Sequence, residues 1–101
     1  MADYKKIILI TGANTGLGYE IIRALAGSNK SYDIFLGGRT VEKAQSAAEL
    51  ARVEFPHSQS TIHPVQIDIE DDQSIDTLLY EIEGKHGKID ILVNNAGTVL
   101  P

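Results

Sequence analysis

Four short runs of branched aliphatic residues alternate with three helical patterns along the chain, and this alternation constrains the fold more than any other feature. Unbroken apolar runs of this length are typical of strands buried on both faces of a sheet. Strands that alternate with helices form parallel sheets through right-handed crossovers. The sequence therefore predicts an α/β fold, with the order βαβαβαβ and a doubly wound parallel sheet. The four expected strands are Ile7–Ile10, Ile34–Leu36, Ile62–Ile67 and Ile89–Val93.

The helical patterns have recognisable ends. The first is expected to stop at Gly27, the second before Pro56 and the third near Gly84 or Gly87, with Asp71 or Asp72 capping the start of the third. A proline lacks the N–H that a strand ladder needs, so Pro64 places the third strand at an edge of the sheet. The 101 residues are enough for one domain, residues 1–101. The three expected helices are Leu17–Ala26, Val41–Ala51 and Ile75–Ile82.

Composition excludes several classes of function. The chain carries 9 Lys and Arg against 14 Asp and Glu, with no basic run, so nucleic acid is not an expected partner. No segment approaches the roughly 20 apolar residues that cross a bilayer. The first apolar run is also shorter than the core of a signal peptide, so we expect no membrane partner and a cytoplasmic location. Cysteine is absent, which excludes disulfides, thiolate metal sites and thiol nucleophiles.

A glycine-rich turn lies between the first strand and the first helix, with the spacing T-G-x-x-x-G-x-G. Gly12 is expected to make the turn, Gly16 to let the backbone approach phosphates, and Gly18 to let the helix pack closely on the strand. The free N–H groups of a helix N-terminus suit a pyrophosphate. No lysine follows the glycines, so this is not a P-loop. The sequence thus predicts a nucleotide site, the alternative being a purely structural turn.

A second motif, Asn94-Asn95-Ala96-Gly97, directly follows the fourth strand. With both motifs in this order, the chain resembles the N-terminal half of the classical short-chain dehydrogenase/reductase family over Lys6 to Gly97. The segment Asn14-Thr15-Gly16-Leu17-Gly18 is similar to its carbonyl-reductase-like subgroup. The resemblance implies a Rossmann-like fold and a nicotinamide dinucleotide cofactor. Beside the three glycines, it implies that Asn14 and Leu17 of the glycine-rich turn bind the cofactor. It also implies that Asp68 and Ile69 contact the adenine, and that Asn95, Ala96 and Gly97 line the adenosine ribose side.

The end of the second strand bears on the choice of cofactor. Folds of this kind that prefer NAD carry an acidic residue there, which binds the ribose 2′-hydroxyl. This chain has Arg39 and Thr40 instead. A guanidinium binds a 2′-phosphate through two hydrogen bonds, whereas a carboxylate repels it. The sequence therefore favours NADP over NAD, the alternative being that Arg39 is a solvated loop residue.

The catalytic residues of the family are not found in this chain. The resemblance implies a Ser and a Tyr-x-x-x-Lys beyond the Asn94–Gly97 segment, and a full-length form that transfers hydride between NADP(H) and a small ketone or alcohol. None of the four tyrosines has a lysine four positions later, and the three histidines are expected at the surface. We therefore expect a truncated portion of an oxidoreductase that is inactive alone. The acidic cluster at Asp68–Asp72 matches no calcium loop, so no metal site is expected.

Two other functions compete with this interpretation. One is a non-catalytic nucleotide-binding or interaction module that self-associates through the fourth strand, whose apolar run lacks a neighbour on one side. The other is a methyltransferase that binds S-adenosylmethionine. That class usually has an acid where this chain has Arg39, and it gives no reason for the Asn94–Gly97 motif.

Overall fold

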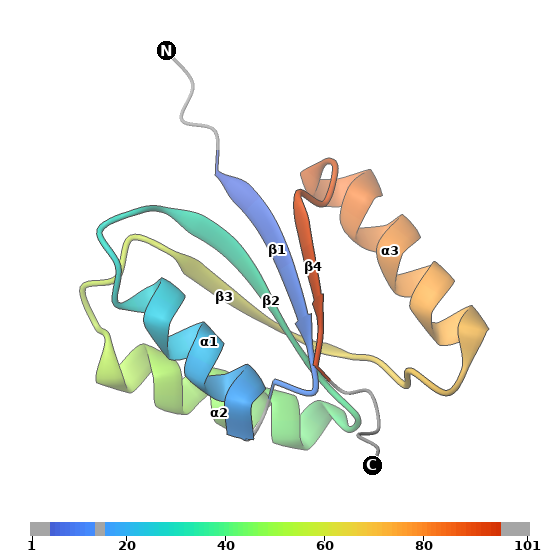
Figure 1. The fold of residues 1–101 in the computed structure, drawn as a ribbon, viewed down its shortest axis with the longest axis horizontal. Helices are drawn as coiled ribbons and strands as arrows, with labels where there is room; N and C mark the ends of the chain where they lie inside the picture. Colours follow the sequence, from blue (N-terminus) through green and yellow to red (C-terminus); the bar gives the residue numbers. More distant parts are fainter. Residues whose placement is uncertain (1–4, 14–15, 96–101) are drawn as a thin grey trace.

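The computed structural model describes residues 5–13 and 16–95, which form one four-stranded parallel sheet with three helices (Figure 1). The spatial order of the strands is β3-β2-β1-β4, and every pairing is parallel. This confirms the predicted βαβαβαβ order and the edge position of the strand that carries Pro64. The elements are β1 (Lys6–Thr11), α1 (Gly16–Ala26), β2 (Tyr32–Gly38), α2 (Val41–Glu54), β3 (Thr61–Gln66), α3 (Asp72–His86) and β4 (Ile91–Asn94).

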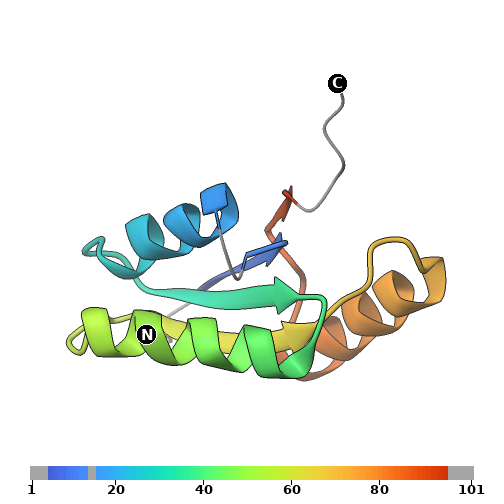
Figure 2. The ribbon, with the colours of Figure 1, turned by 90° about the horizontal axis from the view of Figure 1, so that it is seen from below.

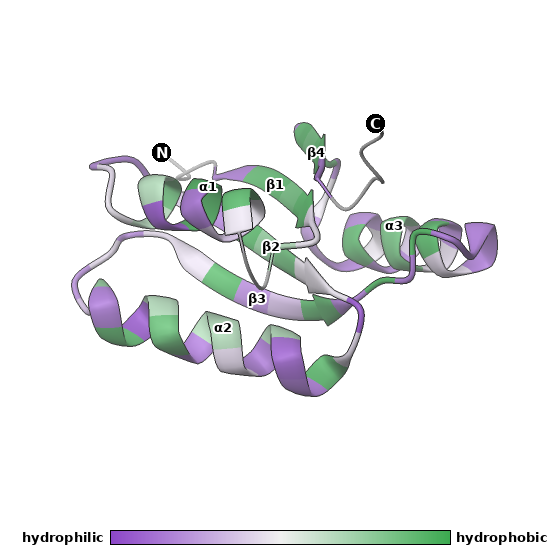
Figure 3. Ribbon diagram, turned by 60° about the horizontal axis from the view of Figure 1, so that its bottom comes forward, coloured by the Kyte–Doolittle hydropathy of each residue, from purple (hydrophilic) through white to green (hydrophobic). Residues whose placement is uncertain are grey.

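Two helices cover one face of the sheet and the third covers the other (Figures 1 and 2). Alternate residues of β1 divide between the two layers: Ile8 and Ile10 pack with α1 and α2, whereas Ile7 and Leu9 pack with α3. All four of these side chains are at most 3% exposed. Burial on both faces explains why the strand is an unbroken apolar run. In Figure 3 green, hydrophobic segments accordingly lie along β1 and β2, whereas green and purple alternate along the helices.

Helix ends follow ordinary capping chemistry. The Thr40 hydroxyl caps α2 by accepting a hydrogen bond from the Lys43 N–H at 3.3 Å. Asp71 caps α3 by accepting from the Gln73 N–H at 3.0 Å. The last helix closes at Gly87, whose φ of 109° suits glycine alone. Of the two candidates at each end of α3, the structure therefore selects Asp71 and Gly87.

The fourth strand begins two residues later than predicted. Asp90 forms two hydrogen bonds with Ile7: its carboxylate accepts from the Ile7 N–H at 2.8 Å, and its own N–H donates to the Ile7 carbonyl at 2.9 Å. Ile89 packs instead against the cluster under α3. Apolar character alone does not distinguish a strand residue from the core residue just before the strand, which is why the prediction placed Ile89 in β4.

Two of the three histidines expected at the surface, the half-buried His63 and the exposed His86, form an aromatic cluster with Phe35. The rings of Phe35 and His63 are stacked with centroids 4.5 Å apart, and His86 completes a triangle at 5.1 and 5.2 Å from them. His63 also hydrogen-bonds through Nε2 to the Asp33 carboxylate at 3.0 Å. The cluster ties the last turn of α3 to β2 and β3.

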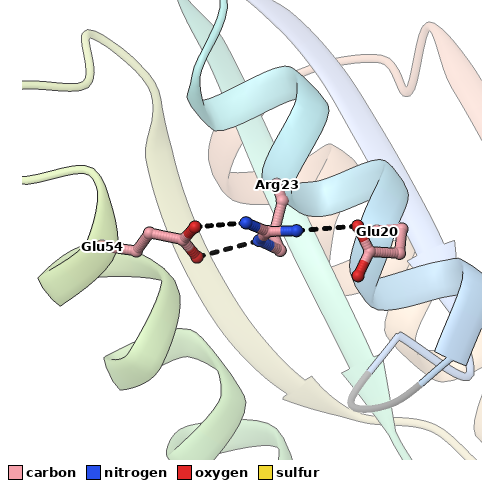
Figure 4. Close-up of polar contacts among 3 residues, drawn as sticks. All are labelled: Glu20, Arg23 and Glu54. Atoms are coloured by element: carbon pink, nitrogen blue, oxygen red, sulfur yellow. Dashed lines mark hydrogen bonds and ion pairs between the residues drawn. The ribbon is translucent and has the colours of Figure 1, made fainter.

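Arg23 joins the two helices on the other face (Figure 4). Its Nε donates to Glu54 at 2.8 Å, a second nitrogen binds the other Glu54 oxygen, and Nη1 donates to Glu20 at 2.8 Å. The hydrogen bonds from Arg23 hold the pKa of Glu54 below its ordinary value. A carboxyl whose pKa is lower in the folded state stabilises the fold above its unfolded pKa, and this contribution is lost as the pH falls through the folded value.

We therefore expect Glu54→Gln to lower the melting temperature slightly at pH 7, and the difference from the wild type to shrink as the pH falls below about 4. Thermal unfolding followed by circular dichroism between pH 3 and pH 7 measures this difference. Glu49→Gln is the matched control, because Glu49 lies 3.9 Å from Arg52 within the same helix and is more exposed. A Glu54→Gln difference that stays constant with pH would contradict the assignment.

Candidate functional site

The carboxyl ends of the four strands meet at one edge of the sheet, which is where open α/β folds bind ligands (Figure 1). The turn that follows β1 lies at this edge. Gly12 and Gly16 have φ values of 59° and 65°, in the left-handed region that favours glycine. Asn14, predicted to bind the cofactor, lies outside the described residues.

Gly18 lies in the first turn of α1, where there is no room for a side chain. A Cβ atom there would lie 2.6 Å from the Gly12 carbonyl oxygen, 2.8 Å from Asn95 Nδ2 and 2.9 Å from the Ala13 Cα. At Gly16, by contrast, nothing would lie within 4 Å of a Cβ. Gly18 therefore brings the helix against the turn, and Gly16 leaves open space at the start of the helix. Leu17 lies between them and is 68% exposed, which leaves an apolar surface beside the turn.

A buried hydroxyl connects this turn to the end of β4. Thr11 is 3% exposed, and its hydroxyl donates to Asn94 Oδ1 at 2.8 Å and accepts from the Asn95 N–H at 3.0 Å. The Asn95 side-chain amide donates to the Gly12 carbonyl at 3.3 Å. Asn95 therefore connects the end of β4 to the glycine turn. Ala96 and Gly97, predicted to line the ribose, lie outside the described residues.

Sequence reasoning missed the parts that Thr11 and Asn94 play in this network. The available signal was a single hydroxyl residue that ends an otherwise apolar strand. A buried hydroxyl requires partners, and the parallel register pairs Thr11 with Asn94.

Arg39 directly follows β2 and is exposed at the same edge. Its guanidinium has no hydrogen bond or ion pair with any side chain in the part of the chain that the structure describes. Thr40 is half-buried, and its hydroxyl is engaged as the cap of α2. Lys43, which sequence reasoning did not single out, is exposed in the first turn of α2. Two cations thus flank the start of this helix, and among the described residues neither side chain forms a hydrogen bond or an ion pair with another side chain.

Asp68 and Ile69 form the tight turn between β3 and α3. The Asp68 carboxylate accepts from the Glu70 N–H at 3.0 Å, and its own N–H donates to the Ser74 hydroxyl at 3.1 Å. The Ile69 side chain packs against the α3 side of the core. The Ile69 side chain is therefore part of the core, while the two hydrogen bonds hold Asp68 in one orientation.

Within residues 5–13 and 16–95, no helix is both long enough and apolar enough to pass through a bilayer. Over the same residues, no three histidine, aspartate or glutamate side chains lie close enough together to hold a metal ion.

A parallel sheet of order β3-β2-β1-β4, with a glycine turn leading from β1 into a helix, defines the first half of a dinucleotide-binding α/β fold. The family model described as short chain dehydrogenase matches residues 6–100. The chain therefore belongs to the short-chain dehydrogenase family.

Relatives and solved structures agree with this membership. The short-chain dehydrogenase/reductase tropE of Talaromyces stipitatus is 41% identical over 96 residues, which is 95% of this chain and 36% of the relative. Menthone neomenthol reductase from Mentha piperita superposes with a TM-score of 0.84 at 33% identity, over 95% of this chain and 33% of that protein. L-sorbose reductase from Gluconobacter frateurii, solved with NADPH and L-sorbose, gives 0.77 at 30% identity, over 93% and 34%. The chain spans about a third of the length of these proteins.

Proposed function

We propose that this chain binds NADP(H) and forms the cofactor-binding portion of a short-chain reductase. The observation that carries the proposal is that a glycine turn at the end of β1 and an exposed Arg39 at the end of β2 lie at the same end of the sheet, and that the Arg39 guanidinium has no side-chain partner among residues 5–13 and 16–95. An N-terminal helix end suits a diphosphate, and a free guanidinium suits a further phosphate. The NADPH held by the L-sorbose reductase relative supports this choice of cofactor.

Each residue at this edge has a role in the proposal. Gly12, Gly16 and Gly18 bring the pyrophosphate against the start of α1, beside Leu17. Arg39, with Lys43 as a second cation, faces the 2′-phosphate, while Thr40 fixes the helix that carries Lys43. The adenine lies against Asp68 and the Ile69 backbone. For the ribose side we propose Asn95, Ala96 and Gly97, and we propose Asn14 as a further cofactor-binding residue.

The proposal for the whole protein is hydride transfer between NADP(H) and a small ketone or alcohol, with the present chain inactive alone. Tyr19 and Arg23 share a helix face, but they do not form a catalytic pair. Burial raises the pKa of Tyr19, which leaves even less of its phenolate form at neutral pH, and Arg23 is occupied by two glutamates.

Isothermal titration calorimetry with NADPH and NADH tests the proposal on the 101-residue chain. We expect NADPH to bind more tightly than NADH, and no NADPH oxidation in the presence of a panel of ketones. The absence of heat with both coenzymes, for folded and monodisperse protein, would overturn the binding function. Oxidation of NADPH by the purified chain would contradict only the prediction that the chain is inactive alone.

A second proposal, that the chain is an interaction module, is favoured by the difference between the two edges of the sheet. The β3 edge carries Pro64, which lacks one backbone N–H, and β3 packs against α2, so pairing at that edge is disfavoured. The β4 edge has neither protection: Ile91 and Leu92 are 43% and 52% exposed, and Ile91–Asn95 contains no charge and no proline. Neighbouring residues of a strand point to opposite faces, so apolar surface is open on both sides of this edge.

We propose that a second copy of the chain occupies this edge. An uncharged strand is compatible with itself in an antiparallel, two-fold arrangement, in which Leu92 of one copy lies opposite Val93 of the other. The strand is only four residues long, so the dimer is weak. Each copy carries a net charge of −5, so added salt should strengthen the association by screening repulsion.

Leu92→Lys is expected to eliminate this dimer, because it places a charge on the pairing edge. Sedimentation velocity over a range of protein and salt concentrations measures the association. Val53→Lys is the matched control, because Val53 is 70% exposed on α2, away from β4. A wild-type chain that stays monomeric throughout, or an equal effect of both substitutions, would contradict pairing through β4.

A further inference from the structure

The backbone that carries Arg39 is held by three consecutive carbonyl groups. The Gly37 carbonyl accepts from the Ala13 N–H of the glycine turn at 2.8 Å, and the Gly38 carbonyl accepts from the Ile67 N–H at 2.9 Å. The Arg39 carbonyl accepts from the side-chain amide of Gln66 at 3.2 Å. The end of β2 is therefore joined to the glycine turn on one side and to the end of β3 on the other.

The first two of these contacts are hydrogen bonds between backbone groups, at glycines that pack closely against their neighbours. A Cβ at Gly37 would lie 2.8 Å from Ile67 Cγ2, and one at Gly38 would lie 3.2 Å from the Ala44 Cβ. The third contact is different in kind, since it comes from an exposed side chain at the last residue of β3. Gln66 is also the strand partner of Gly38 in the parallel register, which places its amide one residue from Arg39.

We infer that Gln66 is a positioning residue for cofactor specificity, holding the Arg39 backbone so that the guanidinium faces the 2′-phosphate. This inference rests on the proposed NADP(H) binding. It places a residue that determines cofactor specificity on β3, outside the glycine-rich turn and outside the Asn-Asn-Ala-Gly motif. Gln66 acts through Arg39 and makes no chemical contribution of its own. Loss of its amide should therefore weaken the binding of NADPH much more than the binding of NADH, which has no 2′-phosphate.

The test is Gln66→Met, which keeps the length of the side chain and removes the donor. We expect the dissociation constant for NADPH to rise about three- to tenfold, the range typical of one lost hydrogen bond, and that for NADH to change less than about twofold. Because Gln66 is exposed, the melting temperature should stay that of the wild type. Gln59→Met is the matched control, since Gln59 is also exposed, in the loop before β3, where it accepts from the Ser31 hydroxyl.

A double-mutant cycle with Arg39→Ala separates positioning through Arg39 from a general structural effect. In the Arg39→Ala background, Gln66→Met should no longer alter NADPH affinity. An equal loss in both backgrounds, or an unchanged ratio of NADPH to NADH affinity in Gln66→Met, overturns the inference while leaving NADP(H) binding intact. If the wild type binds neither coenzyme, the proposed function itself fails. The wild-type titration alone therefore distinguishes a failure of the proposed NADP(H) binding from a failure of the role inferred for Gln66.

Discussion

Replacement of Gly18 by alanine is expected to destabilise the chain and to weaken NADPH binding at least tenfold, which is about 1.4 kcal/mol. The added Cβ would lie 2.6 Å from the Gly12 carbonyl oxygen and 2.9 Å from the Ala13 Cα, and these are backbone atoms of a turn that cannot rotate aside. Overpacking of this kind costs about 1–3 kcal/mol. The helix N-terminus must move away from the turn, and the proposed pyrophosphate site moves with it.

Gly84→Ala provides the matched control because it is the same substitution in another helix. Nothing lies within 4 Å of a Cβ at Gly84, which lies inside α3. Alanine there should raise the free energy of unfolding by about 0.5–1 kcal/mol through helix propensity, with no change in NADPH binding. Thermal unfolding and calorimetry on both variants measure the two effects. A Gly18→Ala chain that binds NADPH as tightly as Gly84→Ala would falsify the location of the site.

Local sequence signals predicted the elements of this fold well, because each signal reports a requirement of one segment. A strand buried on both faces must be apolar throughout, so Ile7–Ile10 already identified β1. Pro64 removes one ladder N–H wherever it lies, so it identified the edge strand without knowledge of the sheet. The same reasoning applies to Gly12, whose positive φ is a property of the turn itself.

Contacts between distant segments could not be predicted in this way. The pairing of Arg23 with Glu54 depends on how α1 lies against α2, and the stacking of His63 on Phe35 depends on the register of β2 with β3. Asn95 shows the limit most clearly. Its motif predicted a place near the ribose, and the structure adds that its amide is used to hold the Gly12 carbonyl.

Arg39→Asp is expected to reverse the preference between the two coenzymes. The wild-type guanidinium is exposed and has no partner among the described side chains, so nothing within them competes with a 2′-phosphate for it. Hydrogen bonds to charged groups contribute about 1.5–3 kcal/mol each, so their loss, together with repulsion from the new carboxylate, should lower NADPH affinity about 100-fold. The same carboxylate can accept a hydrogen bond from the 2′-hydroxyl of NADH, whose affinity should rise.

Lys30→Asp separates this local effect from a change in overall charge. It makes the same charge change at an exposed residue between α1 and β2, at the opposite end of the strands. Lys30→Asp should leave the ratio of NADPH to NADH affinity unchanged, and the wild-type preference for NADPH should weaken at high salt because the contact is exposed. Equal effects of the two substitutions on that ratio would mean that Arg39 acts only through the long-range field of the protein. A guanidinium that binds the 2′-phosphate directly requires a reversal in Arg39→Asp alone.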